Sequence, residues 1–135
     1  MTIVLPHGVL FRGGEEYEIR KNLIEKNNID TIIGLPSNIS FGTGIPTMIM
    51  VLKKRKPDTN IQIIDASKFY IKDGKNNKLR ACDIKRIVDI IMARKDKEKF
   101  SRIVSRDEIV ENDYNLNIPR YVDSSETPEQ RDIYA

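Results

Sequence analysis

Few side chains in this sequence could perform chemistry by themselves. The single histidine, His7, could act as an acid or base or contact a nucleobase, but no cysteine, second histidine or carboxylate lies near it in sequence. A hydrogen-bonded structural role is therefore the favoured interpretation. The single cysteine, Cys82, lies in the first turn of an expected helix, which favours a thiolate only mildly, and nothing else indicates a nucleophile. One cysteine and one histidine also exclude an internal disulfide and a Cys/His metal site.

The common catalytic motifs are absent from the sequence. It has no G-x-x-x-x-G-K-[ST], no G-x-G-x-x-G after a strand and no G-x-S-x-G elbow. Gly42-Thr43-Gly44 is a G-x-G pair, which more often permits a tight turn than binds a ligand. No two carboxylates are placed for acid–base catalysis. From the residues alone, the chain is an α/β domain without a complete catalytic set.

The stretch most typical of a functional site is the connection 36–46, P-S-N-I-S-F-G-T-G-I-P. The apolar runs on either side, Thr31–Leu35 and Thr47–Leu52, predict strands that are buried on both faces. A hairpin needs only about 2–5 connecting residues, and longer connections often carry binding or catalytic groups. We therefore expect function in this loop, whose one aromatic residue is Phe41.

The elements around this loop follow from hydrophobic periodicity. A first strand is predicted at Thr2–Leu5 and a helix at Glu15–Asn27, with Ile19, Leu23 and Ile24 on its buried face and Arg20 elsewhere. Strand, helix and strand predict a unit in which the first two strands are parallel. The strand Thr47–Leu52 follows without a helix and is expected to be antiparallel to the second.

The second half of the chain gives weaker patterns, with one clear helix. That helix, at about Cys82–Arg94, is predicted to bury Ile84, Ile87, Val88 and Ile91. The other expectations are a strand at Ile61–Ile64, an exposed loop at Lys68–Arg80, an extended piece at Ser101–Val104, a short helix from Ser105 to about Asn112 started by an S-x-x-E capping box, an extended segment at 114–121 and a frayed tail at 124–135.

Charge is unevenly distributed along the chain. Residues 1–49 hold 4 Lys/Arg and 5 Asp/Glu, residues 50–106 hold 17 and 7, and residues 107–135 hold 2 and 8. A basic middle indicates either a phosphate-facing surface or solvated faces that attract the acidic end. No run approaches about 18 apolar residues, and the first residues lack the pattern of a signal peptide. The sequence thus indicates a cytosolic, metal-free protein with no membrane partner.

Four segments together resemble one enzyme family. They are V-L-P-H-G-V-L-F-R-G-G (4–14), I-G-L-P-S-N-I-S-F-G-T-G-I-P-T (33–47), I-I-D-A-S (63–67) and E-N-D-Y-N-L-N-I-P-R-Y-V (111–122). In order and spacing they resemble the modification subunit of type I restriction–modification systems, an N6-adenine DNA methyltransferase that uses S-adenosylmethionine. The resemblance implies an α/β fold: the second half of a Rossmann-like methyltransferase sheet, mixed parallel and antiparallel, with helices packed on it.

The sequence departs from the family in what it lacks. The family's glycine-rich cofactor motif and catalytic Asn-Pro-Pro-Phe/Tyr motif belong upstream of the first strand, and neither occurs here. We therefore expect residues 1–122 to be the C-terminal part of the catalytic domain and 123–135 to be a flexible tail. The full-length parent would use S-adenosylmethionine, whereas this piece alone is expected neither to bind the cofactor nor to methylate.

The resemblance also implies site residues. An enzyme that methylates adenine N6 flips the base out of the duplex, and in similar methylases an aromatic of the loop between the last two strands stacks on it. Phe41 is the candidate here, unless it only closes the core under the loop. The remaining candidates are Thr43, Gly44 and Pro46 shaping the pocket, His7 and Arg12 on its rim, and Lys53, Lys54, Arg55 and Lys56 for DNA phosphates, although a charged run is more often a solvated turn.

The expected partners are DNA and the specificity and restriction subunits of a type I complex. An unpaired first strand, Thr2–Leu5, would also permit a homodimer through the sheet edge. Two alternatives stay open. One is a non-catalytic docking module for a specificity subunit, using the helix Cys82–Arg94 and the segment 114–121; the other is a small basic nucleic-acid-binding protein.

Overall fold

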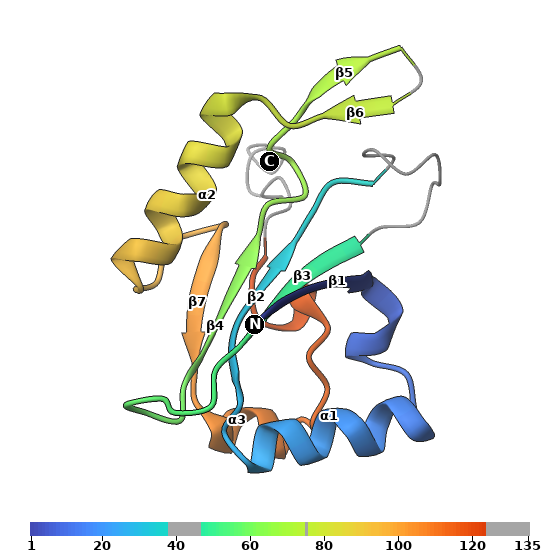
Figure 1. Ribbon diagram of the computed structural model, residues 1–135, viewed down its shortest axis with the longest axis vertical. Coiled ribbons are helices and arrows are strands. Elements are labelled where there is room, and N and C mark those ends of the chain that lie inside the picture. The colour runs from blue at the N-terminus through green and yellow to red at the C-terminus, as the bar shows by residue number, and fades with distance from the viewer. Residues whose placement is uncertain (38–46, 75, 124–135) are drawn as a thin grey trace, which may run out of the picture.

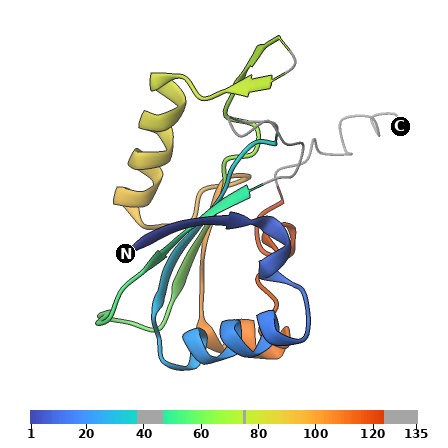
Figure 2. The ribbon, with the colours of Figure 1, turned by 45° about the vertical axis from the view of Figure 1, so that its right-hand side comes forward.

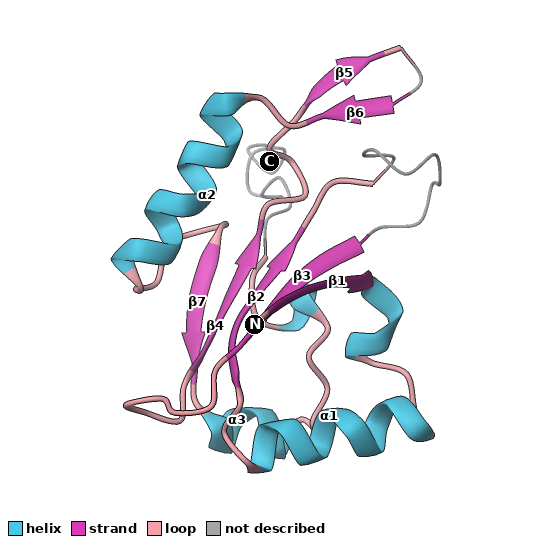
Figure 3. Cartoon of the chain, viewed as in Figure 1, coloured by secondary structure: helices cyan, strands magenta, loops and turns pink. Residues whose placement is uncertain are grey.

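The computed structural model describes residues 1–37, 47–74 and 76–123 of the chain (Figure 1). Within this part, a five-stranded sheet carries helices on both faces, and a small hairpin extends from it (Figure 3). The elements in chain order are β1 (Thr2–Pro6), the 3-10 turn η1 (His7–Leu10), α1 (Glu15–Glu25), β2 (Ile29–Gly34), β3 (Thr47–Leu52), β4 (Ile61–Asp65), β5 (Ile71–Asp73), β6 (Asn76–Lys78), α2 (Ala81–Ala93), β7 (Ser101–Val104), α3 (Arg106–Glu111) and the 3-10 turn η2 (Ile118–Arg120).

The strand order of the main sheet is β1-β3-β2-β4-β7. β3 lies antiparallel between β1 and β2, so those two strands run in the same direction without touching, and the predicted antiparallel pairing of β2 with β3 is confirmed. β4 is parallel to β2, and β7 is antiparallel to β4. The carboxyl ends of β1, β2 and β4 therefore meet at one edge of the sheet.

Two hydrophobic cores cover the two faces of the sheet. α1, α3 and the segment around Leu116 pack on one face, and α2 packs on the other (Figure 2). β2 is buried along its whole length, as predicted. On β3 the pattern alternates instead, with Met48 and Met50 buried and Ile49 only partly so. The expectation that β3 is buried on both faces is therefore wrong, because within the described part of the chain α2 packs over β4 and covers Ile49 only partly.

The buried face of α1 differs from the predicted one. Ile19 is 61% exposed, whereas Arg20 is buried. The Arg20 guanidinium donates to the backbone carbonyls of Val9 (2.9 Å), Arg12 (3.0 Å) and Tyr114 (2.7 Å). A long side chain with several donors therefore lies on the face of α1 that aliphatic residues were expected to fill.

The predicted apolar stripe of α2 is also displaced. Ile87 is buried, but Ile84 and Val88 are about half exposed, at 50% and 47%. The residue that completes the buried face is Ile90, which the prediction omitted. The helix is therefore rotated on its axis from the predicted orientation, and an apolar strip of its surface faces outward.

Three local predictions in the second half of the chain have different outcomes. The capping box is confirmed in part: Ser105 Oγ accepts from the Glu108 amide at 3.2 Å, while the Glu108 carboxylate pairs with Arg102 at 2.7 Å. The exposed loop expected at Lys68–Arg80 is instead the hairpin β5–β6, turning at Gly74 with a positive φ of 65°. The segment 114–121 is not wholly extended, because it contains η2.

No helix in the described part of the chain is long and apolar enough to cross a membrane.

Candidate functional site

A small cavity lies at the edge where β1, β2 and β4 end. Its volume is about 140 Å³. Each strand contributes the residues that follow or complete its carboxyl end, which is where α/β sheets bind ligands most often. The lining residues are His7, Gly34, Leu35, Asp65, Ser67, Ile118 and Pro119.

His7, directly after β1, is a half-buried polar residue that lines this cavity. It begins η1 directly after Pro6, and its ring meets the exposed ring of Phe11 edge-on, with 5.8 Å between ring centroids. Burial lowers the pKa of the His7 imidazole, and the nearby Asp65 carboxylate opposes that shift. A neutral imidazole has one donor and one acceptor nitrogen, so His7 can bind a group that offers either.

Asp65 ends β4 and is the buried carboxylate of the cavity. One of its oxygens accepts from the Ser67 amide at 2.9 Å and from the Ser67 hydroxyl at 2.5 Å. These bonds orient the carboxylate at the strand end. Sequence reasoning did not select Asp65 or Ser67 as site residues. The only signal was their place in the I-I-D-A-S segment directly after a strand.

The part of the cavity wall at the end of β2 depends on a glycine, Gly34. A Cβ on Gly34 would lie 2.6 Å from Ile118 Cδ1, so a side chain at the end of β2 would force the Ile118 side chain to move. Ala66 N also donates to the Gly34 carbonyl at 2.8 Å, which ties the end of β2 to the turn after β4. The wall is therefore assembled from segments that are distant in sequence, and its shape depends on their packing.

The structure describes Ser37 and Thr47 at the two ends of the connection between β2 and β3, but the candidate residues Phe41, Thr43, Gly44 and Pro46 lie outside the described residues. Leu35 N donates to Thr47 O at 3.0 Å. Both ends of the loop therefore leave the sheet at the edge that carries the cavity. Arg12 lies close by: its guanidinium packs over Gly8, and it pairs loosely with Glu16 at 3.8 Å.

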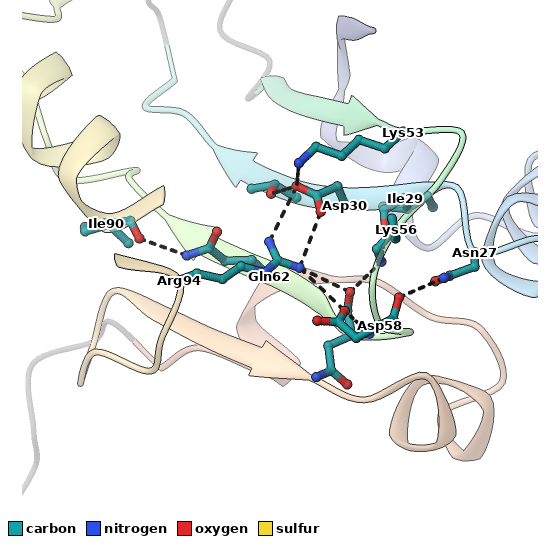
Figure 4. Close-up of polar contacts among 11 residues, drawn as sticks. Asn27, Ile29, Asp30, Lys53, Lys56, Asp58, Gln62, Ile90 and Arg94 are labelled. Carbon is teal, nitrogen blue, oxygen red and sulfur yellow. Dashed lines mark hydrogen bonds and ion pairs between the residues drawn. The ribbon is translucent and has the colours of Figure 1, made fainter. Parts of the chain in front are cut away.

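The basic run 53–56 lies at the opposite edge, after the carboxyl end of β3 (Figure 1). Lys53 Nζ lies 3.6 Å from the buried Asp30 carboxylate, which also pairs with Arg94 at 3.4 Å (Figure 4). Lys56 Nζ donates to Ile29 O at 2.7 Å and to Asn60 O, and burial lowers the pKa of this ammonium. Lys54 and Arg55 are exposed. The structure thus separates these four cations from His7 and Arg12 by the length of β3.

No cluster of metal-ligating side chains occurs among residues 1–37, 47–74 and 76–123.

Comparisons with family models, curated proteins and solved structures all indicate the same family. The model of the family described as N-6 DNA Methylase matches residues 1–130. Two curated relatives are type I restriction enzyme methylase subunits: MpnII of Mycoplasma pneumoniae, 40% identical over 98% of this chain, and MjaVII of Methanocaldococcus jannaschii, 41% identical over 97% of it. The chain spans 24% of the length of each.

A solved structure agrees with this result. The type I restriction–modification methyltransferase subunit from Streptococcus thermophilus is 52% identical, with a TM-score of 0.90 over 93% of this chain and 26% of its own. The EcoKI M protein, at 17% identity, shares the fold with a TM-score of 0.72.

Proposed function

The chain belongs to the N-6 DNA methylase family, and on this premise we propose that it forms the target-base side of an adenine-N6 DNA methyltransferase of a type I restriction–modification system. The observation that carries the proposal is the position of the loop ends. Ser37 and Thr47 leave the sheet beside the cavity of His7 and Asp65. Residues 1–122 act as one part of the catalytic domain in this proposal, with 123–135 as its tail.

The proposed chemistry begins with an adenine that is rotated out of the duplex. Such a base must be stacked and held by hydrogen bonds at its edge. Phe41 supplies the stacking ring, and Thr43, Gly44 and Pro46 shape the loop around it. His7, neutral because of its lowered pKa, contributes a hydrogen-bonding group on the rim, and Arg12 adds a cation beside it.

The methyl donor in this proposal is S-adenosylmethionine, which the family uses. The cavity of His7 and Asp65 does not fit it. The cavity of about 140 Å³ is well below the roughly 300 Å³ at which small-molecule sites begin, and the sequence has no glycine-rich strand-turn-helix. We therefore assign no residue of this chain to the cofactor and place no step of methyl transfer on it.

Substitution of Phe41 in an active methyltransferase that contains this chain tests the proposal. Loss of base stacking costs about 1–3 kcal/mol per base. Phe41→Ala should therefore lower kcat/KM for methylation of a duplex by about fivefold to 150-fold, and Phe41→Trp should retain most of the activity. Incorporation of labelled methyl groups measures both. If Phe41→Ala methylates as fast as the wild type, the target-base assignment is wrong.

The outward apolar strip on α2 supports a second role, docking of a protein partner. Ile84, Val88 and Met92 recur at intervals of four residues and are 47–78% exposed. We propose the specificity subunit of the type I system as the occupant and the restriction subunit as a further member of the complex. Ile84→Asp should weaken binding of the specificity subunit in a pull-down and leave the fold of this chain intact. Unchanged binding would exclude this surface.

β1 supports the proposed homodimer. Among the described residues, β1 has a neighbouring strand on one side only, β3, and is one of the two edge strands of the sheet. A lysine at the half-exposed Val4 should suppress pairing of two such edges. Sedimentation of the isolated chain with and without Val4→Lys measures this, and a wild type that stays monomeric at high concentration excludes the dimer.

A further inference from the structure

The hairpin β5–β6 lies at the same edge as the candidate site, and the proposed function gives it no role. It follows β4 and the Asp65 turn in sequence and precedes α2. The side-chain amide of Asn77 on β6 donates to the Ser37 carbonyl at 2.7 Å, so the hairpin contacts the described start of the connection between β2 and β3. Figures 1 and 2 show the hairpin projecting beyond the end of β4.

The register of the hairpin gives it two distinct faces. Residues directly opposite each other in an antiparallel pair point to the same side, and successive residues alternate. Lys72 lies opposite Asn77, and Ile71 lies opposite Lys78. Lys72 therefore shares the face of Asn77, which meets Ser37, whereas Lys78 points to the other face. Lys72 and Lys78 therefore lie on opposite faces of the hairpin.

The charge of this segment is strongly positive. Residues 68–80 include five Lys/Arg and one Asp. Arg80 is paired with Asp83 at 3.0 Å, but Lys72 and Lys78 are exposed and form no ion pair with another described residue. Their ammonium groups are therefore available to an external anion. Lys53 and Lys56 at the opposite edge differ, since they already contact a carboxylate and backbone carbonyls.

We propose that the β5–β6 hairpin is a DNA-backbone contact and that Lys72 binds a phosphate of the duplex beside the adenine. The inference rests on the proposed function, because it takes the target adenine to be held at this edge. Duplex DNA carries about one negative charge per 1.7 Å of its axis, so a duplex that presents a base here brings phosphates to any element projecting from the edge. A lysine ammonium binds a phosphate oxygen as a compact point charge.

The test compares Lys72→Gln with Lys78→Gln in an active methyltransferase that contains this chain. Both substitutions remove one exposed charge from the same hairpin, so Lys78→Gln controls for net charge. Fluorescence anisotropy with a labelled duplex gives the affinity between 50 and about 200 mM salt. Loss of one phosphate contact should reduce the slope of log affinity against log salt by about 0.9 and weaken binding about fivefold to tenfold near 0.1 M salt. Lys72→Arg should retain wild-type binding.

The outcomes separate this inference from the proposed function. A reduced slope in Lys72→Gln and a near-wild-type slope in Lys78→Gln support the hairpin contact. A wild-type slope in Lys72→Gln overturns the hairpin contact. If Phe41→Ala nevertheless loses methylation, the proposed function stands without that contact. Equal losses in both lysine variants overturn the assignment of the contact to the Lys72 face. If Phe41→Ala methylates normally, the proposed function fails, whatever the salt slopes show.

Discussion

Arg20 joins three segments of the chain through a single guanidinium. Its nitrogens contact the carbonyls of Val9 and Arg12 around η1 and of Tyr114 near the C-terminal segment. The site residue His7 begins η1, so the position of His7 depends indirectly on a side chain of α1. The buried Arg20 side chain therefore links the segment that carries His7 to α1 and to the C-terminal segment.

Removal of the Arg20 guanidinium should cost substantial stability. Arg20→Met leaves three carbonyls without this donor, and we expect the free energy of unfolding to fall by about 2–4 kcal/mol. Ile19→Ala, at the exposed neighbouring position, should change it by no more than about 0.5 kcal/mol. Urea denaturation of both variants measures the difference. Similar values for the two would contradict the orientation of α1 described above.

The lowered pKa of His7 makes stability depend on pH. The unfolded chain binds a proton at His7 near pH 6.5, and the folded chain binds it at a lower pH. Stability is thus fully present above the unfolded pKa and decreases as the pH falls toward the folded pKa. We therefore expect the free energy of unfolding to fall between pH 7 and 5. His7→Asn should remove that part of the pH dependence in denaturation curves, and an identical pH profile would contradict it.

Among the elements, α2 has two apolar sides, of which the sheet covers one. Ile87 and Ile90 face the core that contains Ile33 and Ile64. The helix also carries Ile84, Val88 and Met92, so apolar residues occupy more than half of its circumference. A pattern this broad predicts the helix well, but it leaves open which of two overlapping stripes is buried. Only packing against β4 decides that question.

A matched pair of substitutions distinguishes the two stripes. Ile90→Ala should lower the free energy of unfolding by about 2–4 kcal/mol, because it removes buried methyl groups and leaves a cavity. Val88→Ala, two residues away and half exposed, should cost less than about 1 kcal/mol. Thermal or urea unfolding measures both, and a larger cost at Val88 would restore the stripe predicted from the sequence.

The sequence predicted the long and strongly patterned elements and missed those that depend on three-dimensional context. β2, α1 and the antiparallel β3 follow from periodicity and connection length. The hairpin β5–β6 was missed because strands of three residues with polar side chains carry almost no periodic signal, although Asp73-Gly74 marks its turn. Asp65 could not be singled out, because an acidic residue after a strand is common until the fold brings it beside His7.

At the scale of the whole molecule, the two basic regions lie at opposite edges of the sheet. β3 spans six residues, which corresponds to about 20 Å between its ends. Because duplex DNA carries about one phosphate charge per 1.7 Å of its axis, phosphates bound at the His7 edge would differ from those bound by Lys54 or Arg55. The phosphate contacts proposed for the run 53–56 and for Lys72 are thus separable by experiment.

A double substitution at the far edge checks this separation. Lys54→Gln with Arg55→Gln removes two exposed charges and leaves the Lys53 and Lys56 contacts in place. We expect the salt slope of DNA binding to change less than it does in Lys72→Gln, and methylation to stay near the wild-type rate. A slope reduced by about 1.8 would instead show that both cations bind phosphates.

The order of the strands has a consequence for the time course of synthesis. Within residues 1–37, 47–74 and 76–123, the one strand that pairs with β1 is β3, in a register that joins Thr2 to Val51. On a ribosome that adds about 5–20 residues per second, Thr2 therefore waits several seconds before its partner exists. Throughout that interval the nascent β1 carries unpaired backbone groups and the apolar side chains of Ile3, Val4 and Leu5. A cell making this protein must thus keep a strand-forming segment from pairing with other chains until β3 has left the ribosome.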